Sequence, residues 1–307
     1  MDLYSIKLKV ITILAGIGIA LLFSLIAYGL LYYFYGLSGI SIIYFLLIFV
    51  LFIDIIQWLV SPYIIGMTYR LQKVSPMSQY GYLIDIVHDA AEKNNIKEPE
   101  VYIAMRGSPN AFAYSSPLAG KRIAFTKSIL DILNRDELEA VAGHELGHLK
   151  HHDVELLLAI GLIPTLIFYL GYSMIFSGFG RRNGGSFFLV AIILFILSSV
   201  FNIMILGVNR IRESYADVNS AMTIPNGAEN LQNALAKIYS YSMPSKQTSN
   251  STVNMLMFSD HIENDLGRDY RKLVEKWKNM KPPVSIFSDH PHPAKRIQIL
   301  ERYKNSF

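Results

Sequence analysis

The 307-residue chain contains no cysteine. A chain without cysteine forms no disulfide, no thiolate metal site and no cysteine nucleophile, so any metal must be held by His, Asp or Glu. Charged residues are also scarce, at 17% of the chain, where soluble domains have about a quarter. Hydrophobic residues reach 52% and the mean hydropathy is +0.31. The composition therefore predicts that part of the chain lies in lipid.

The charge balance is only mildly basic, with a net charge of +4. That excess is too small to predict binding to nucleic acid, whereas it suits contact with anionic lipid. We therefore expect a lipid bilayer as a partner and no nucleic acid.

Four apolar runs are long enough to cross a bilayer as helices, which takes about 20 residues. They are Val10–Tyr33, Ile40–Val60, Val154–Phe176 and Phe187–Val208. The first run is too long for a cleaved signal peptide and is soon followed by another, so it predicts a retained anchor. The chain then divides into segments 1–61 and 154–208, with two transmembrane helices each, and polar segments 62–153 and 209–307.

Lys and Arg near the span ends predict the orientation, because cytoplasmic loops are enriched in them. Most of the basic pairs flank the same side: Lys7 and Lys9, Arg70 and Lys73, and Arg210 and Arg212. Arg181 and Arg182, between the third and fourth spans, argue for the opposite orientation. The majority places both polar segments in the cytoplasm, on one face of the cell membrane.

The polar segments contain patterns of both strands and helices. Short strands are predicted over Val101–Ala104, Ala111–Ser115 and Ile123–Thr126. Helices are predicted over Tyr80–Asn94, Asn209–Asn219, Asn226–Tyr241 and Leu266–Asn279, and a loop over Met243–Thr252. A further helix begins at Asn134, where Glu137 three residues later completes a capping box.

That capped helix carries the sequence HELGH at residues 144–148. Residues four apart share a helical face, so His144 and His148 can converge on one ion, and neutral imidazoles are ligands that zinc prefers. Glu145 is rotated about a third of a turn away. It is placed to take a proton from a water whose pKa the metal has lowered to about 7. The alternative is a pair of surface histidines on an ordinary helix.

A catalytic zinc ion needs a third protein ligand, and Glu213 is the best candidate. Asp217 lies four residues later on the same face, where it can accept a hydrogen bond from a ligand imidazole. Asp217 is also the alternative third ligand. Taken alone, the segment favours the alternative of a solvated helix with Arg210, Arg212, Glu213 and Asp217 in ordinary ion pairs.

These motifs together resemble the HtpX family of membrane zinc proteases, which is related to the Ste-type CAAX prenyl proteases. The resemblance covers nearly the whole chain. The matching features are two early spans, the segment Asn110-Ala111-Phe112-Ala113, the HELGH helix, Arg212-Glu213 with Ala216-Asp217 after the fourth span, and His290-Pro291 followed by Arg296.

The resemblance implies that Asn110–Ala113 forms an edge strand beside the active site, to which an extended substrate adds as a further strand. An interior strand is the alternative. It also implies that His290 reaches toward the active site, where it would stabilise the oxyanion of the scissile carbonyl. A histidine in an ordinary turn is the alternative for His290.

We therefore predict a mainly α membrane protein with four transmembrane helices and a zincin-like α+β domain with a small β-sheet. As the family implies, it is expected to be a zinc endopeptidase with one catalytic ion that cleaves membrane or misfolded proteins. A CAAX prenyl-protein protease is the nearest alternative, disfavoured by the low number of spans. A non-catalytic metal-binding scaffold has no need of Glu145, and a transporter would need more polar residues within the spans.

Overall fold

The computed structural model describes residues 40–178, 184–242, 269–283, 287–288 and 290–304, and these form two compact units. The helical unit holds the described residues up to Ser61, those of His152–Glu213, and residues 287, 288 and 290. The sheet unit holds the described residues of Pro62–His151, Ser214–Ser285 and Pro291–Phe307. Helices α2 (Ile40–Tyr69) and α7 (Gly184–Thr223) each contribute residues to both units.

Three helices in the described part of the chain are long and apolar enough to cross a membrane. They are α2, α6 (Asp153–Gly178) and α7, with candidate spans at Val50–Tyr69, Asp153–Ile175 and Gly185–Thr223. Three of the four predicted spans therefore correspond to such helices. The first predicted span, Val10–Tyr33, lies outside the described residues.

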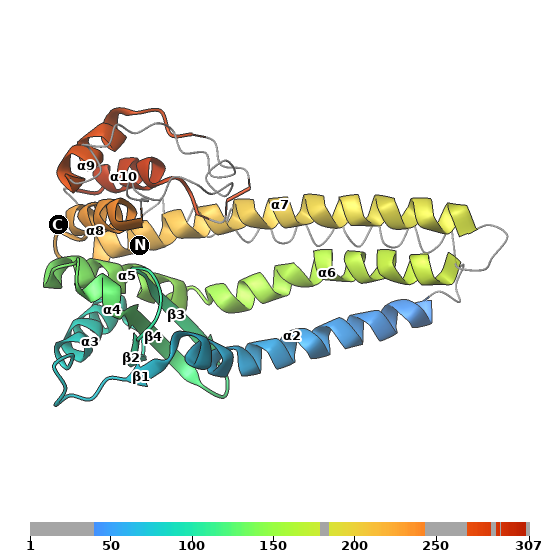
Figure 1. Ribbon diagram of the computed structural model, residues 1–307, viewed down its shortest axis with the longest axis horizontal. Helices are drawn as coiled ribbons and strands as arrows, with labels where there is room; N and C mark the ends of the chain where they lie inside the picture. The colour runs from blue at the N-terminus through green and yellow to red at the C-terminus, as the bar shows by residue number, and fades with distance from the viewer. Residues whose placement is uncertain (1–39, 179–183, 243–268, 284–286, 289, 305–307) are drawn as a thin grey trace, which may run out of the picture. The chain divides into compact units, whose positions relative to one another are not determined.

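Helices α6 and α7 run side by side in the helical unit (Figure 1). Their buried apolar side chains form one cluster that includes Ile163, Ile167, Leu194 and Phe201. The Ser198 hydroxyl on α7 donates a hydrogen bond to the carbonyl oxygen of Pro164 on α6 at 2.8 Å. The two helices are thus joined by apolar packing and one buried polar contact.

The described residues of the sheet unit contain a four-stranded mixed sheet in the order β1-β2-β4-β3. The strands are β1 (Leu71–Lys73), β2 (Glu100–Ala104), β3 (Ala111–Ser116) and β4 (Gly120–Thr126). Strands β2 and β4 are parallel, and the other two pairs are antiparallel. The three predicted strands are confirmed, whereas the three residues of β1 are too few to show an alternating pattern.

The sheet packs on one face against α3 (Tyr82–Asn94) and α5 (Arg135–Lys150). Alternate residues of a strand point to the same face, and the register pairs Val101 with Ile123 and Ile103 with Phe125. All four of these side chains are buried in one cluster with apolar residues of α3 and α5. This core fixes α5, the helix that carries HELGH.

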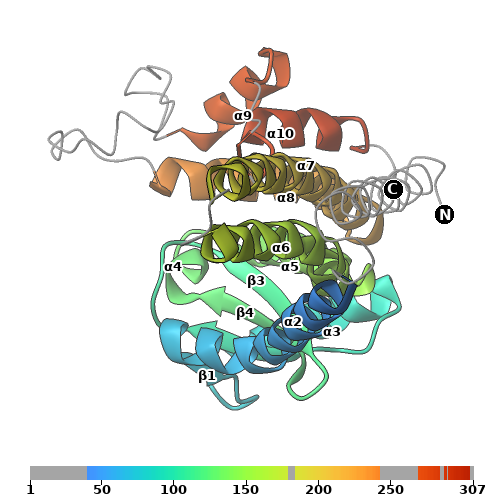
Figure 2. The same ribbon diagram turned by 90° about the vertical axis from the view of Figure 1, so that its right-hand side faces the viewer.

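The remaining helices of the sheet unit are α4 (Lys127–Leu130), α8 (Gly227–Ser242), α9 (Tyr270–Asn279) and α10 (Pro293–Glu301). Helices α8, α9 and α10 pack together in both views (Figures 1 and 2). The fully buried Trp277 lies in their common core, and the Gln298 side chain donates to its carbonyl oxygen at 2.9 Å. Helices α4 and α10 were not predicted.

Two predicted boundaries differ from the structure. The helix expected over Asn209–Asn219 is the continuation of α7, which runs without a break from Gly184 to Thr223, through Gly207. Helix α2 continues past Val60 to Tyr69 in spite of Pro62. The predicted loop Met243–Thr252 lies outside the described residues, and the division into four segments stays a prediction.

Candidate metal centre

The two histidines of HELGH meet on one face of α5. The helix begins with the predicted capping box: the Asn134 side chain accepts from the Glu137 N–H and Glu137 accepts from the Asn134 N–H, both at 2.9 Å. One turn apart on this helix, His144 and His148 place their Nε2 atoms 3.3 Å from each other. His144 is only 6% exposed, so the alternative of a surface histidine pair is wrong for this residue.

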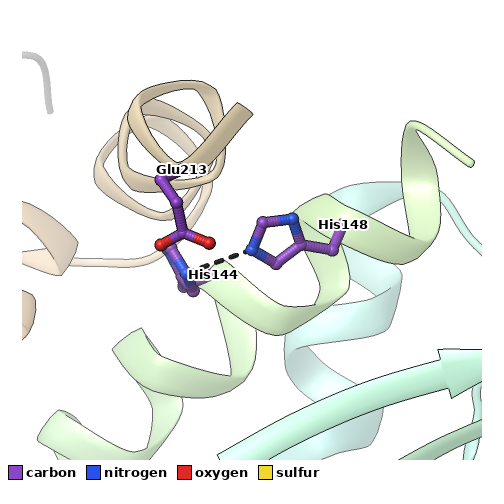
Figure 3. Close-up of side chains that lie close together, drawn as sticks. All are labelled: His144, His148 and Glu213. Atoms are coloured by element: carbon purple, nitrogen blue, oxygen red, sulfur yellow. Dashed lines mark hydrogen bonds between the residues drawn. The ribbon is translucent and has the colours of Figure 1, made fainter. Parts of the chain in front are cut away.

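Glu213 on α7 is the third member of the group. His144, His148 and Glu213 each offer one ligand atom, and these atoms all lie within 4.8 Å of one another (Figure 3). The glutamate is 8% exposed and Asp217 is fully buried, so the alternative of a solvated helix face is wrong.

The donor atoms suit a zinc ion. Two imidazole nitrogens, each about 2.0–2.1 Å from a tetrahedral zinc ion, are about 3.3–3.4 Å apart. The Nε2 atoms of His144 and His148 have this separation, at 3.3 Å. Two imidazoles and one carboxylate also match a three-ligand catalytic site with an open position. The residues therefore fit the metal that the sequence predicts.

Asp217 lies behind His144 and fixes the orientation of its ring. The Asp217 Oδ1 is 3.1 Å from the His144 Nδ1. A proton held on Nδ1 by this carboxylate makes Nε2 the ring nitrogen that can bind a metal. This distance is compatible with the role predicted for Asp217, which is to accept a hydrogen bond from a ligand imidazole.

Arg296, from α10, holds Asp217 in turn. Its guanidinium group donates to both carboxylate oxygens of Asp217, with the shortest contacts at 2.6 and 2.9 Å. The same guanidinium lies 3.4 Å from the His144 ring nitrogens. Such a bidentate pair compensates the buried charge of the carboxylate. In the sequence, Arg296 is distinguished only by its position after His290-Pro291, and the sequence analysis predicted no role for it.

Glu145 faces the edge of the sheet. Among the strands of the described residues, β3 stands at the end of the strand order, which contradicts the alternative of an interior strand for Asn110–Ala113. Asn110 directly precedes the strand, and its N–H and carbonyl bond to Thr126. The N–H of Ala113 donates to the Glu145 carboxylate at 3.0 Å. The expected base and the expected substrate strand are thus neighbours.

Phe112, on the same strand, packs with its ring centroid 4.9 Å from that of Tyr69 on α2. Its side chain therefore holds the strand against the last turn of α2.

His290 contacts the candidate ligand from α7. Its Nδ1 lies 3.1 Å from the Glu213 Oε2, and its side chain is 68% exposed. An exposed imidazole next to a ligand carboxylate is available to a bound substrate, which is compatible with the predicted role.

Comparison with known proteins gives the family. The family model described as Peptidase family M48 matches residues 77–304. The chain belongs to peptidase family M48. The matched residues include HELGH, Glu213, Asp217 and Arg296.

Relatives match along nearly the whole chain. A Protease HtpX homolog of Thermoplasma volcanium is 51% identical over 99% of this chain and 97% of its own length. A Protease HtpX homolog of Thermoplasma acidophilum is 50% identical over all of both chains. The predicted resemblance to HtpX proteases is confirmed, and the chain is a membrane-bound metalloprotease.

The fold also has a solved counterpart. The crystal structure of S. mikatae Ste24p superposes with a TM-score of 0.58 at 16% identity, covering 96% of this chain and 67% of that one. At this identity the likeness concerns the fold alone: a mainly helical protein with a small mixed sheet.

Proposed function

We propose that this M48 protease is a zinc endopeptidase that cleaves membrane or misfolded polypeptides on the cytoplasmic side of the cell membrane. The observation that carries the proposal is the meeting of His144, His148 and Glu213 within 4.8 Å, with Glu145 beside an edge strand. The relatives named Protease HtpX support the same reaction.

The proposed metal ligands are His144, His148 and Glu213, which would hold one zinc ion. When bound, zinc lowers the pKa of water to about 7 and polarises a carbonyl group. The remaining chemistry belongs to the protein. The Glu145 carboxylate accepts the proton of the attacking water and returns it to the leaving amine. Asp217 and Arg296 keep the His144 ring in place.

Substrate binding is proposed to use the edge of the sheet. An extended peptide adds alongside Asn110–Ala113 through backbone groups that do not pair with β4, such as the Ala113 N–H, which places a scissile bond next to Glu145. To bind a substrate carbonyl, the Ala113 N–H would exchange its hydrogen bond with Glu145 for one with the substrate. His290 is proposed to donate a hydrogen bond to the oxyanion that forms.

The test is proteolysis by the detergent-purified full chain. We expect cleavage of an unfolded protein substrate, loss of cleavage with a chelator, and recovery when zinc is returned. Cleavage that persists in chelator after the metal has been shown to be gone would contradict the proposal. Comparing an unmodified peptide with its prenylated counterpart separates the endopeptidase from a prenyl-protein protease, since only the latter requires the lipid.

A further inference from the structure

The turn between β3 and β4 exposes an apolar tip. It consists of residues Pro117–Ala119, and the Leu118 side chain is 66% exposed. The tip has a defined shape, because the Ala119 N–H donates to the Ser116 hydroxyl at 3.1 Å. Gly120 closes the turn with a φ of +70°, a conformation that favours glycine. The leucine is thus held outward by a structured hairpin.

Two contacts within the sheet unit give the direction of this hairpin relative to α2. Phe112, which pairs with Ala124, packs against Tyr69 with ring centroids 4.9 Å apart. The Arg122 guanidinium lies 6.0 Å from the centre of the Tyr63 ring. The direction from Ala124 to Arg122 along β4 is therefore roughly the same as the direction from Tyr69 to Tyr63 along α2.

The dimensions of the two elements agree with this alignment. Six residues of helix rise about 9 Å, and two residues of strand about 7 Å. Leu118 lies four residues before Arg122, so continuing along the hairpin carries it up to about 13 Å further. The tip therefore points past Tyr63, in the direction from the C-terminal to the N-terminal end of the α2 segment that belongs to the sheet unit.

That direction leads into the membrane. Tyr63 and Tyr69 both belong to the candidate span Val50–Tyr69. The neighbouring side chains of α2 are exposed apolar groups, with Ile64 at 52% and Met67 at 73%. Tyrosine at the end of a span is typical of the interface between hydrocarbon and headgroups. A hairpin that starts beside these tyrosines reaches that interface with its tip.

Two cations stand directly behind the tip. Arg122 is held in place by Glu100 at 3.6 Å and by the Tyr102 ring at 5.2 Å. Lys121 points to the opposite face of β4 and has no ion pair in the described part of the chain. An apolar tip followed by a basic residue matches the order of acyl chain and anionic headgroup across an interface.

We propose that the β3–β4 hairpin is a membrane anchor of the sheet unit: Leu118 inserts into the interface of an anionic bilayer and Lys121 binds lipid phosphates. The anchor is independent of metal and of catalysis. If β3 is the substrate strand proposed above, the anchor also holds that strand close to the bilayer surface, where segments of membrane proteins emerge.

The absence of cysteine makes a direct test possible. Leu118→Cys is labelled with an environment-sensitive fluorophore, and the full chain is reconstituted in nanodiscs that contain anionic lipid. Ser108→Cys is the matched control, because Ser108 is exposed and precedes β3 at its other end. We expect a blue-shifted emission at position 118 and severalfold stronger quenching by lipids spin-labelled near the headgroup than at position 108.

A second comparison tests the lysine. Adding Lys121→Gln to the Leu118→Cys chain should weaken the quenching in anionic nanodiscs and leave it unchanged in zwitterionic ones. Equal emission and quenching at positions 118 and 108 would overturn the anchor, whatever the protease activity. If the quenching changes neither with the lipid charge nor with Lys121→Gln, the proposal that Lys121 binds lipid phosphates is overturned.

Discussion

Two carboxylates one turn apart on α7 illustrate how neighbours decide the role of a residue. Glu213 lies within reach of two imidazole nitrogens, whereas Asp217 is fully buried and bound by the Arg296 guanidinium. The arginine compensates the charge of Asp217 and occupies both of its oxygens. A carboxylate engaged in this way supports a ligand better than it serves as one, which favours Glu213 as the metal ligand.

Metal content should separate the two roles. Glu213→Ala removes a proposed direct bond, so bound zinc should fall to almost nothing after dialysis. Asp217→Ala removes support from His144, which typically costs about 10–100-fold in affinity or activity. Zinc is measured by elemental analysis on both variants. If Glu213→Ala keeps full zinc while Asp217→Ala loses it, the two assignments must be exchanged.

The base is tested by a change that leaves the ligands alone. Glu145→Gln should keep its zinc, since the side chain is not a proposed ligand, but lose proteolysis by about a hundredfold or more because an amide accepts no proton. Initial rates of peptide cleavage and metal content are measured together. Glu139→Gln is the control on the same helix, where the partly buried glutamate pairs with Lys93 and faces no proposed ligand. Substantial activity in Glu145→Gln would refute the assignment.

At the scale of elements, two glycines of α5 allow the close approach of α7. A Cβ atom at Gly143 would lie 2.5 Å from the Cγ1 of Ile224, which directly follows α7, and one at Gly147 would lie 3.1 Å from the Nδ2 of Asn219 within α7. Asn219 also donates to the Gly143 carbonyl at 3.0 Å. The glycines weaken an isolated helix, so their presence is explained by this contact. It brings Asp217 to His144.

A methyl group at this contact should loosen the helix pair. Gly143→Ala is expected to lower the free energy of unfolding by about 1–3 kcal/mol, the usual cost of overpacking. Gly161→Ala in α6 is the control, because nothing lies within 4 Å of its added Cβ. Thermal unfolding in detergent should show a lower midpoint for Gly143→Ala only. Equal midpoints for both variants would show that Ile224 moves aside at no cost.

At the scale of the whole molecule, α7 links the membrane with the metal centre. Its 40 residues give a length of about 60 Å, roughly twice the hydrocarbon thickness of a bilayer. The helix is therefore long enough to cross a bilayer and extend beyond it, and its polar end, after Val208, carries Glu213 and Asp217. The side of the membrane on which that end emerges decides where proteolysis occurs.

Labelling of single introduced cysteines measures on which side of the membrane the polar end of α7 lies. A cysteine at Ser38 or Gly184 should react with an impermeant reagent added outside cells, and one at Ser249 should not, because the basic residues predict a cytoplasmic metal centre. Ser38 and Ser249 lie outside the described residues, so labelling is the direct measurement. The cysteine-free parent is the blank. The reverse pattern would place the metal centre outside the cytoplasm.

The sequence by itself determined the features that depend on neighbours along the chain. The imidazole pair is one helical turn apart, the capping box spans three residues, and the spans are continuous apolar runs. Hydropathy and helical periodicity act within such short windows. They therefore predicted α5 with HELGH, the three longer strands and the spanning helices before any packing was known.

Only the tertiary structure decided the contacts between distant segments. Asp217 and Arg296 are 79 positions apart and Ala113 and Glu145 are 32 apart, and no local pattern predicts their meeting. The short strand β1 and the position of β3 at the sheet edge likewise depend on partners. The orientation of the hairpin along α2 also arises from packing, through the contacts of Arg122 and Phe112. Conformational entropy keeps these residues apart in the unfolded chain. They meet only when the apolar core fixes the positions of the helices and strands that carry them.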